Sequence, residues 1–240
     1  MIKIAICDDD NNFLNELRNY ISQRFNDSIS KIDTFHDGVE LLNYIKDYEE
    51  VYDFIFLDIG MNSLSGIDTG RKLRKMPEHR HSSIFFITSY NTNPRPIVDI
   101  HPFAYINKPV NYDEFSLKFS EALIIHNDGQ NIIRIKAGKN SYLIHPIDVY
   151  YLKSGYRSTT VHSINGEINI KLSLSKVEKI LAQKSRLFVR INASTIINLK
   201  YLNTSKPKEI IMNDKNLTHH ALTRTYHKRF FQKCNDILFH

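Results

Sequence analysis

The chain contains few cysteines and no long apolar run, and both absences limit the classes of protein to which it can belong. Its two cysteines, Cys7 and Cys234, are too few for a disulfide framework. The N-terminal segment MIKIAIC lacks the layout of a signal peptide. No apolar run approaches the roughly 20 residues that a membrane-spanning helix needs. We therefore expect a protein of the reducing cytoplasm that has no membrane partner.

The motifs of common enzymes are absent as well. The sequence has no Gly-rich phosphate-binding loop, and no Ser/His/Asp arrangement follows from its spacing. His219, His220 and His227 have no cysteine or carboxylate at ligand spacing. We therefore expect solvated or phosphate-facing histidines there, and we do not expect an enzyme.

The charge of the chain is divided unevenly along its length. With 240 residues and 42% apolar content, the chain has enough material for two domains with separate cores. Residues 1–126 hold 13 Lys/Arg and 19 Asp/Glu, a net charge of −6, whereas residues 127–240 hold 19 and 7, a net charge of +12. A basic half attracts polyanions, nucleic acid first and anionic lipid second. The polar composition of residues 127–131 predicts a linker between domains at 1–126 and 132–240.

The first half alternates apolar runs with segments of helical period, which is the pattern of a parallel sheet covered by helices. The stretch from Phe13 to Phe25, for example, carries apolar residues at three- and four-residue steps. We predict a doubly wound α/β domain of five βα units around a five-stranded parallel sheet. Its expected strands are residues 2–7, 31–35, 54–58, 83–88 and 104–107.

Polar residues stand where these expected strands end. Asp8 and Asp9 follow the first strand, and Asp58 ends the third. Because the carboxyl ends of parallel strands form one edge of the sheet, we expect these carboxylates to meet there, together with Thr88 and Lys108. Crowded carboxylates repel one another unless a cation or full solvation relieves them. The alternative, in which Asp10 caps the next helix and the others face water, stays open on these residues alone.

Such a set of oxygen ligands suits Mg²⁺. A carboxylate oxygen can attack phosphorus to give an aspartyl phosphate, while the metal and an ammonium group neutralise the phosphoryl oxygens. The sequence therefore predicts phosphoryl chemistry at this edge of the sheet.

The motifs DDD at 8–10, FLDIGMNSLSG at 56–66, ITS at 87–89 and YINKP at 105–109 resemble those of the response-regulator receiver family. The resemblance covers about residues 1–126 and implies a flavodoxin-like fold with Asp58 as the phosphoacceptor. It implies a Mg²⁺ site made by Asp8, Asp9, Asp58 and the Gly60 carbonyl. It also implies a switch hydroxyl at Thr88, an aromatic that changes rotamer at Tyr105, a phosphoryl contact at Lys108, a cis bond before Pro109 and the family's glycine at Gly66.

One position departs from the family pattern. The family commonly has proline four residues after the phosphoacceptor, whereas this chain has Asn62. The change predicts a more mobile loop from Gly60 to Ser65 and an altered phosphate lifetime.

The second half has the composition of a mostly β domain. Asn165-Gly166 is a hairpin signal, and no helix-turn-helix pattern is present. A nucleic-acid contact is therefore expected from loops and strand ends, at 156–158, 192–194 and 223–225. The expected strands are 132–136, 141–144, 149–152, 159–162, 167–172, 187–191, 195–198 and 209–212, and the expected helices are 173–183 and 224–238.

This half resembles the LytTR-type DNA-binding domain of bacterial response regulators over about residues 131–238. The resemblance is carried by LFVRINASTIINLKYL at 187–202, with support from DVYYLKSGYRSTTVH and ALTRTY. Asn192 replaces the family's usual histidine, and Ala193 stands where Asn, Arg or Lys is frequent, which predicts altered or weaker specific binding. The implied DNA contacts are Arg157 and Arg224, followed by Asn192, Ser194, Lys200 and Lys228, whereas a structural role is at least as expected for Arg190 and Asn198.

Together these features predict a cytoplasmic response regulator of a two-component system. A sensor histidine kinase would phosphorylate Asp58, and the phosphorylated chain would form a homodimer that binds double-stranded promoter DNA. One alternative keeps the receiver but makes the basic half a protein-, RNA- or lipid-interaction module. Another makes the first half an aspartate-based phosphohydrolase, although Asp58 lacks a second acid two residues later.

Overall fold

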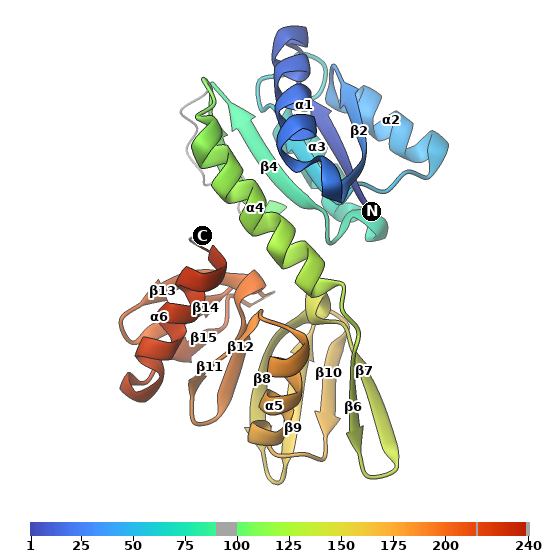
Figure 1. Ribbon diagram of the computed structural model, residues 1–240. Coiled ribbons are helices and arrows are strands. Elements are labelled where there is room, and N and C mark those ends of the chain that lie inside the picture. The colour runs from blue at the N-terminus through green and yellow to red at the C-terminus, as the bar shows by residue number, and fades with distance from the viewer. Residues whose placement is uncertain (90–99, 215, 239–240) are drawn as a thin grey trace. The chain divides into compact units, whose positions relative to one another are not determined.

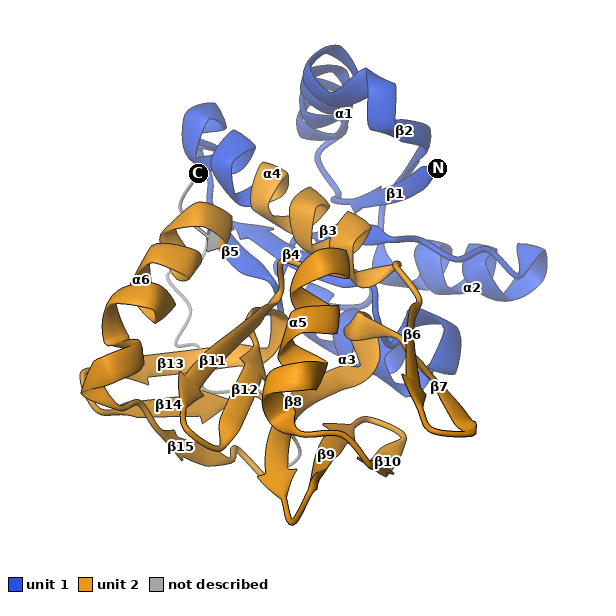
Figure 2. Cartoon of the chain, turned by 60° about the horizontal axis from the view of Figure 1, so that its bottom comes forward, with its two compact units in different colours: residues 1–118 blue, residues 119–240 orange. Residues whose placement is uncertain are grey.

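The chain divides into two compact units, Met1–Lys118 (unit 1) and Phe119–His240 (unit 2), which Figure 2 colours separately. The computed structural model, drawn in Figure 1, describes residues 1–89, 100–214 and 216–238. None of the helices within these ranges combines the length and the apolar content needed to cross a membrane.

Unit 1 contains the predicted five-stranded parallel sheet, in the order β2-β1-β3-β4-β5. The strand order reverses beside β1, which pairs with β2 on one side and with β3 on the other. The carboxyl ends of β1 and β3 therefore lie at the switch point, where sheets of this kind bind their ligands. The strands are β1 (Ile2–Cys7), β2 (Ile29–Phe35), β3 (Phe54–Leu57), β4 (Ser83–Thr88) and β5 (Ala104–Asn107).

Helices cover the two faces of this sheet because neighbouring strand residues point to opposite sides. Ala5 and Cys7 of β1 share one buried cluster with Leu41 of α2 and Leu73 of α3. On the other face, the ring of Phe56 in β3 lies 5.5 Å from that of Phe115 in α4. The helices are α1 (Asn11–Phe25), α2 (Gly38–Tyr48), α3 (Gly66–Lys75) and α4 (Tyr112–Gly129). The helix expected between β4 and β5 falls largely on residues 90–99, which lie outside the described residues.

The first two helices begin where aspartates cap them. Asp10 accepts hydrogen bonds from the backbone N–H groups of Asn12 and Phe13, at 2.8 and 3.4 Å. Asp37 caps α2 in the same way. The capping alternative is therefore correct for one aspartate of the 8–10 run, and it leaves Asp8 and Asp9 to be explained.

The expected linker at 127–131 is partly helical. Helix α4 continues to Gly129, and the two compact units divide between Lys118 and Phe119, inside this helix. A linker was predicted from the polar composition of this stretch, but one of its polar residues, Asp128, is buried in unit 2. Its carboxylate accepts hydrogen bonds from Ser185 Oγ at 2.5 Å and from the backbone N–H of Arg186 at 2.9 Å.

Unit 2 is mostly β, as predicted. Its main sheet has the order β10-β9-β8-β12-β11, and it is accompanied by a three-stranded sheet (β13-β14-β15) and a two-stranded sheet (β6-β7). The strands are β6 (Ile133–Ala137), β7 (Asn140–Ile144), β8 (Val149–Gly155), β9 (Ser158–Ser163), β10 (Gly166–Ile170), β11 (Phe188–Asn192), β12 (Thr195–Asn198), β13 (Leu202–Lys206), β14 (Glu209–Met212) and β15 (His219–Ala221).

Two helices complete unit 2, α5 (Leu174–Lys184) and α6 (Arg224–Leu238). Val177 and Leu181 of α5 share a buried cluster with Leu152 of β8 and Val161 of β9. The predicted hairpin joins β9 to β10, and Gly166 adopts a φ of 107°, which side chains other than glycine rarely accept.

Candidate functional sites

The three carboxylates expected at the sheet edge do lie together. Residues Cys7 of β1 and Leu57 of β3 are register partners, so the residues that follow both strands emerge side by side. Asp8, Asp9 and Asp58 each offer an oxygen, and these atoms all lie within 4.8 Å of one another. Asp8 and Asp58 are buried, whereas Asp9 is exposed.

Lys108 reaches this cluster from the end of β5. Its Nζ lies 2.6 Å from Asp8 Oδ2 and 3.6 Å from Asp58 Oδ1. The same ammonium lies 4.3 Å from the centre of the Phe13 ring, a favourable position for a cation. Burial raises the pKa of Asp8, and the hydrogen bond from Lys108 opposes that rise. The Lys108–Pro109 bond is cis, as the receiver resemblance implied.

Backbone groups fix the two buried carboxylates. Asp58 Oδ2 accepts from the N–H of Gly60 at 2.9 Å, and Asp8 Oδ1 accepts from the N–H of Asp10 at 3.0 Å. A Cβ at Gly66 would come within 2.1 Å of the Asp58 carbonyl oxygen, so only glycine fits where α3 begins beside the site. Asp58, the phosphoacceptor candidate, is thus held by the N–H of Gly60 and by the close approach of Gly66 to its carbonyl oxygen.

The donor set fits a hard divalent cation. Three carboxylates face one ammonium, so the fully ionised cluster keeps an excess of negative charge. All the candidate ligands are oxygens, the donor type that Mg²⁺ prefers. Among the residues that the structure describes, no other group of three or more His, Cys, Asp or Glu side chains lies close enough to share an ion.

Thr88 and Tyr105 occupy neighbouring strands next to this cluster. Thr88 is buried at the end of β4, and its carbonyl accepts from the N–H of Lys108 at 2.9 Å. Tyr105 of β5 is 36% exposed, with its ring 5.6 Å from that of Phe86. These positions on β4 and β5 remain the candidates for the switch residues that the receiver resemblance implies.

The residue that replaces the family's proline contacts the acidic cluster. Asn62 Nδ2 donates to Asp9 Oδ2 at 3.1 Å, a bond that proline cannot make. The next residue, Ser63, donates from Oγ to Asp37 Oδ2 at 3.0 Å. The loop that we expected to be more mobile is therefore attached at two points.

In unit 2, two of the three candidate DNA loops meet. The backbone N–H of Thr223 donates to the Ile191 carbonyl at 3.1 Å, which joins the start of α6 to β11. Asn192 Nδ2 donates to the Ala221 carbonyl at 2.8 Å. Arg224, the first residue of α6, and Lys228 one turn later are both exposed.

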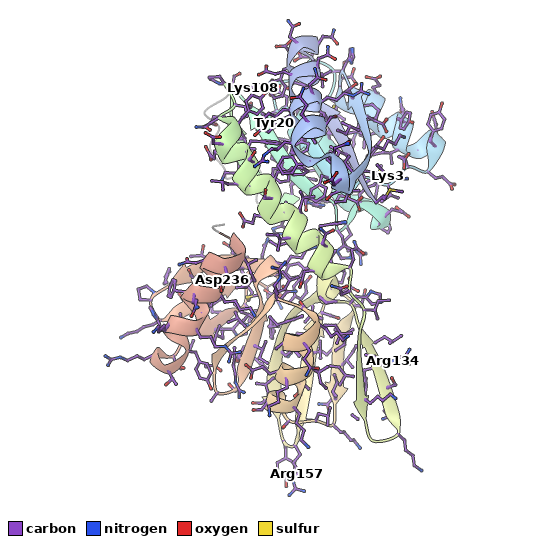
Figure 3. All side chains as sticks on the ribbon, in the orientation of Figure 1. Lys3, Tyr20, Lys108, Arg134, Arg157 and Asp236 are labelled. Carbon is purple, nitrogen blue, oxygen red and sulfur yellow. The ribbon has the colours of Figure 1, made fainter. Side chains whose placement is uncertain are left out.

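The third loop lies at the same end of the main sheet. The N–H of Ser154 near the end of β8 donates to the Ser194 carbonyl at 2.8 Å, just before the hairpin that carries Arg157. Figure 3 shows Arg157 at the tip of that hairpin. Its φ is 52°, and its guanidinium lies 5.6 Å from the exposed ring of Tyr156. Lys200, in contrast, follows the far end of β12 and is not brought to these loops.

Three further residues have internal roles. Arg190 donates from Nη1 to Glu178 Oε2 at 3.0 Å. Asn198 is fully buried and donates from Nδ2 to two backbone carbonyls. The structure also corrects the expectation for His220, which is buried against the Tyr151 ring rather than solvated.

Comparisons with known proteins agree with both halves. Residues 4–119 match the response regulator receiver domain, and residues 139–235 match the LytTr DNA-binding domain. The sensory transduction protein LytR of Staphylococcus epidermidis is 24% identical over 256 residues, which cover 97% of this chain and 98% of that protein. The sensory transduction protein LytT of Bacillus subtilis is 22% identical over 244 residues, which cover 95% and 97%. The chain belongs to the response regulators with a LytTR DNA-binding domain. It is thus a transcription regulator of a two-component system.

Solved structures similar to this response regulator cover about half of its chain. The response regulatory domain of MrkE from Klebsiella pneumoniae is 23% identical, covers 52% of this chain and 98% of that chain, and gives a TM-score of 0.47. TrrA from Thermotoga maritima, solved in complex with Mg²⁺ and BeF, is 26% identical, covers 51% and 99%, and gives a TM-score of 0.43.

Sequence reasoning missed the contacts of two polar residues of this response regulator. Asp128 was assigned to a linker because its partners Ser185, Arg186 and Leu187 lie at least 57 positions away. The contact of Asn62 with Asp9 spans 53 positions. No local pattern announces either contact, although a lone aspartate near the end of an apolar helix is a weak signal.

Proposed function

We propose that a sensor histidine kinase phosphorylates this response regulator on Asp58. In this step an Asp58 carboxylate oxygen forms a bond to phosphorus as the bond between phosphorus and the kinase histidine breaks. The product is an aspartyl phosphate, and the kinase histidine is regenerated. The observation that carries the proposal is the convergence of Asp8, Asp9, Asp58 and Lys108 on one edge of the sheet.

Each residue at that edge has a distinct role in the proposal. Lys108, within 3.6 Å of Asp58, would pair with the phosphoryl oxygens and offset their charge. Asp8, Asp9, Asp58 and the Gly60 carbonyl would hold Mg²⁺, which when bound supplies further positive charge at the phosphoryl group. Thr88 would donate its hydroxyl hydrogen to a phosphoryl oxygen, and Tyr105 would turn inward as the hydroxyl moves.

The charge of the phosphoryl group would change how the side chains around it pack. A phosphoryl group adds roughly −1.5 to −2 charge at neutral pH, enough to bias a face with two alternative packings. We propose that the face around β4 and β5 pairs two receivers, and that residues 1–126 carry this switch. Pairing then places two domains made by residues 132–240 on neighbouring DNA half-sites, which raises occupancy by about 10²-fold through effective concentration.

We propose that DNA is bound at the end of the main sheet of unit 2 where the three loops lie. Arg157 and Arg224 would make the main contacts, with Asn192, Ser194 and Lys228 beside them. Their common location at this end of the sheet supports the assignment of these residues as DNA contacts. Lys200 lies at the other end of β12. We propose a cytoplasmic location, which a DNA partner supports.

A selection of bound DNA from a random pool tests this function, with phosphorylated wild type, Asp58→Asn and Arg224→Ala compared. We expect paired half-sites at a fixed spacing for the wild type, weaker enrichment for Asp58→Asn, and lost discrimination for Arg224→Ala. Equal, salt-labile binding of every polyanion by wild type and Arg224→Ala would instead support a general interaction module. Turnover of small phosphoesters would support the hydrolase alternative.

A further inference from the structure

The candidate DNA loops of unit 2 differ from one another in how their polar side chains are used. We infer that Asn192 is a positioning residue that joins the 192–194 turn to the Arg224 segment and does not read bases. The inference rests on the proposed DNA-binding function and deepens it. It assigns base recognition to Arg157 and Arg224, and it leaves the 192–194 turn to contact only the sugar-phosphate backbone of the DNA.

The amide of Asn192 is engaged at both ends. Its Oδ1 accepts from the N–H of Ser194 at 2.9 Å and from Ser194 Oγ at 3.0 Å. Its Nδ2 donates to the Ala221 carbonyl at 2.8 Å. An asparagine that reads adenine needs its own oxygen and nitrogen together for a bidentate contact. Asn192 cannot offer that pair while it holds the two segments.

The other side chains of the 192–194 turn offer few free polar groups that could read a base. Ala193 has no polar group beyond its backbone, and the Ser194 hydroxyl donates to Asn192. Arg190 holds the turn from the inside, because its Nε donates to the Asn192 carbonyl at 3.1 Å and its Nη2 donates to the Ala193 carbonyl at 2.5 Å. Its side chain is only 14% exposed, so this arginine is also unavailable to DNA.

The bond from Asn192 acts on the segment that leads to Arg224. It fixes Ala221, and the N–H of Thr223 is bound to the Ile191 carbonyl at 3.1 Å. The chain therefore enters α6 from two anchored points, with Arg224 as its first helical residue. Loss of the Asn192 side chain frees one of these points and leaves the base-reading groups in place but less well oriented.

The test measures affinity for the selected sequence and for all its single-base variants, in wild type, Asn192→Ala, Arg224→Ala and the double variant. Asn203→Ala, an exposed asparagine of the same unit, is the matched control. We expect Asn192→Ala to weaken binding about tenfold for every sequence alike, with the ranking of the variants unchanged. Arg224→Ala changes the ranking. In the double variant the two losses are less than additive, because Asn192 acts through the Arg224 segment.

Three outcomes are informative. A changed base preference in Asn192→Ala, or additive losses in the double variant, overturns the inference while the proposed function stands. A wild type that selects no sequence overturns the proposed function, and the inference with it. Should Asn192→Ala fail to fold, Asn192→Ser carries the test, since a serine hydroxyl can accept from Ser194 but is too short to reach Ala221.

Discussion

Replacing Asp128 with alanine should destabilise unit 2 by about 3 kcal/mol. The carboxylate accepts from Ser185 Oγ at 2.5 Å, from the Arg186 N–H at 2.9 Å and from the Leu187 N–H at 3.3 Å, and it is 9% exposed. Hydrogen bonds to charged groups contribute roughly 1.5–3 kcal/mol each, and a buried donor left unpaired costs about 1–3 kcal/mol.

Two of the contacts of Asp128 contribute less than these values. Leu187 keeps a second acceptor, because its N–H also lies 3.2 Å from Ser185 Oγ. The ion pair of Asp128 with Arg186, at 3.9 Å and with a 63% exposed arginine side chain, contributes little. The loss that remains comes mainly from the Ser185 hydroxyl and the Arg186 N–H, which gives the value of about 3 kcal/mol.

The assay is urea unfolding followed by hydrogen exchange and mass spectrometry, because peptides from each unit then report their own transition. Asp236→Ala, an exposed aspartate of unit 2 labelled in Figure 3, is the control and should change stability by less than about 0.5 kcal/mol. A loss of less than about 1 kcal/mol in Asp128→Ala, or a shifted unfolding transition only in peptides of unit 1, would contradict this role of Asp128.

Three further predictions concern single side chains. Lys108→Ala leaves the buried Asp8 carboxylate without its cation, so unit 1 should lose about 3 kcal/mol at neutral pH in a chelator. Because the pKa of Asp8 is already raised and rises further in the variant, this loss should shrink as the pH falls and should be partly restored by Mg²⁺, both readable from urea midpoints. Gly66→Ala brings a Cβ within 2.1 Å of the Asp58 carbonyl oxygen and should lower the free energy of unfolding of unit 1 by about 1–3 kcal/mol, whereas an unchanged thermal midpoint would contradict this contact. Burial lowers the pKa of His220 from 6.5 to about 4, so the unfolded chain binds more protons than the folded chain between these values. Unit 2 should therefore be about 2 kcal/mol less stable at about pH 5 than at neutral pH, and His220→Leu should remove that difference in urea titrations.

The sequence allowed most of the sheet elements to be predicted because buried strands read as apolar runs. Strands β1, β4 and β5 have the predicted bounds, since each is followed by a charged or turn-forming residue. Strand β13 was missed because four of its five residues are exposed and carry no apolar alternation. Strand β15 has only three residues, too few for a period to be recognised.

The acidic site was predictable for a reason that the polar contacts of unit 2 do not share. The ends of parallel strands must meet at one edge, so topology alone brings Asp8 near Asp58. The role of Asn192 depends on Ala221, 29 positions away, and on which way its amide points. Such contacts depend on tertiary packing, which neither spacing nor composition specifies.

The most direct test of the central claim is phosphoryl uptake from a small phosphodonor, read by intact-protein mass spectrometry on wild type and Asp58→Asn with Mg²⁺ or a chelator. We expect wild type to gain one phosphoryl group with Mg²⁺ and little with the chelator, and Asp58→Asn to gain none. Uptake by Asp58→Asn at the wild-type level would contradict the assignment of Asp58 as the acceptor.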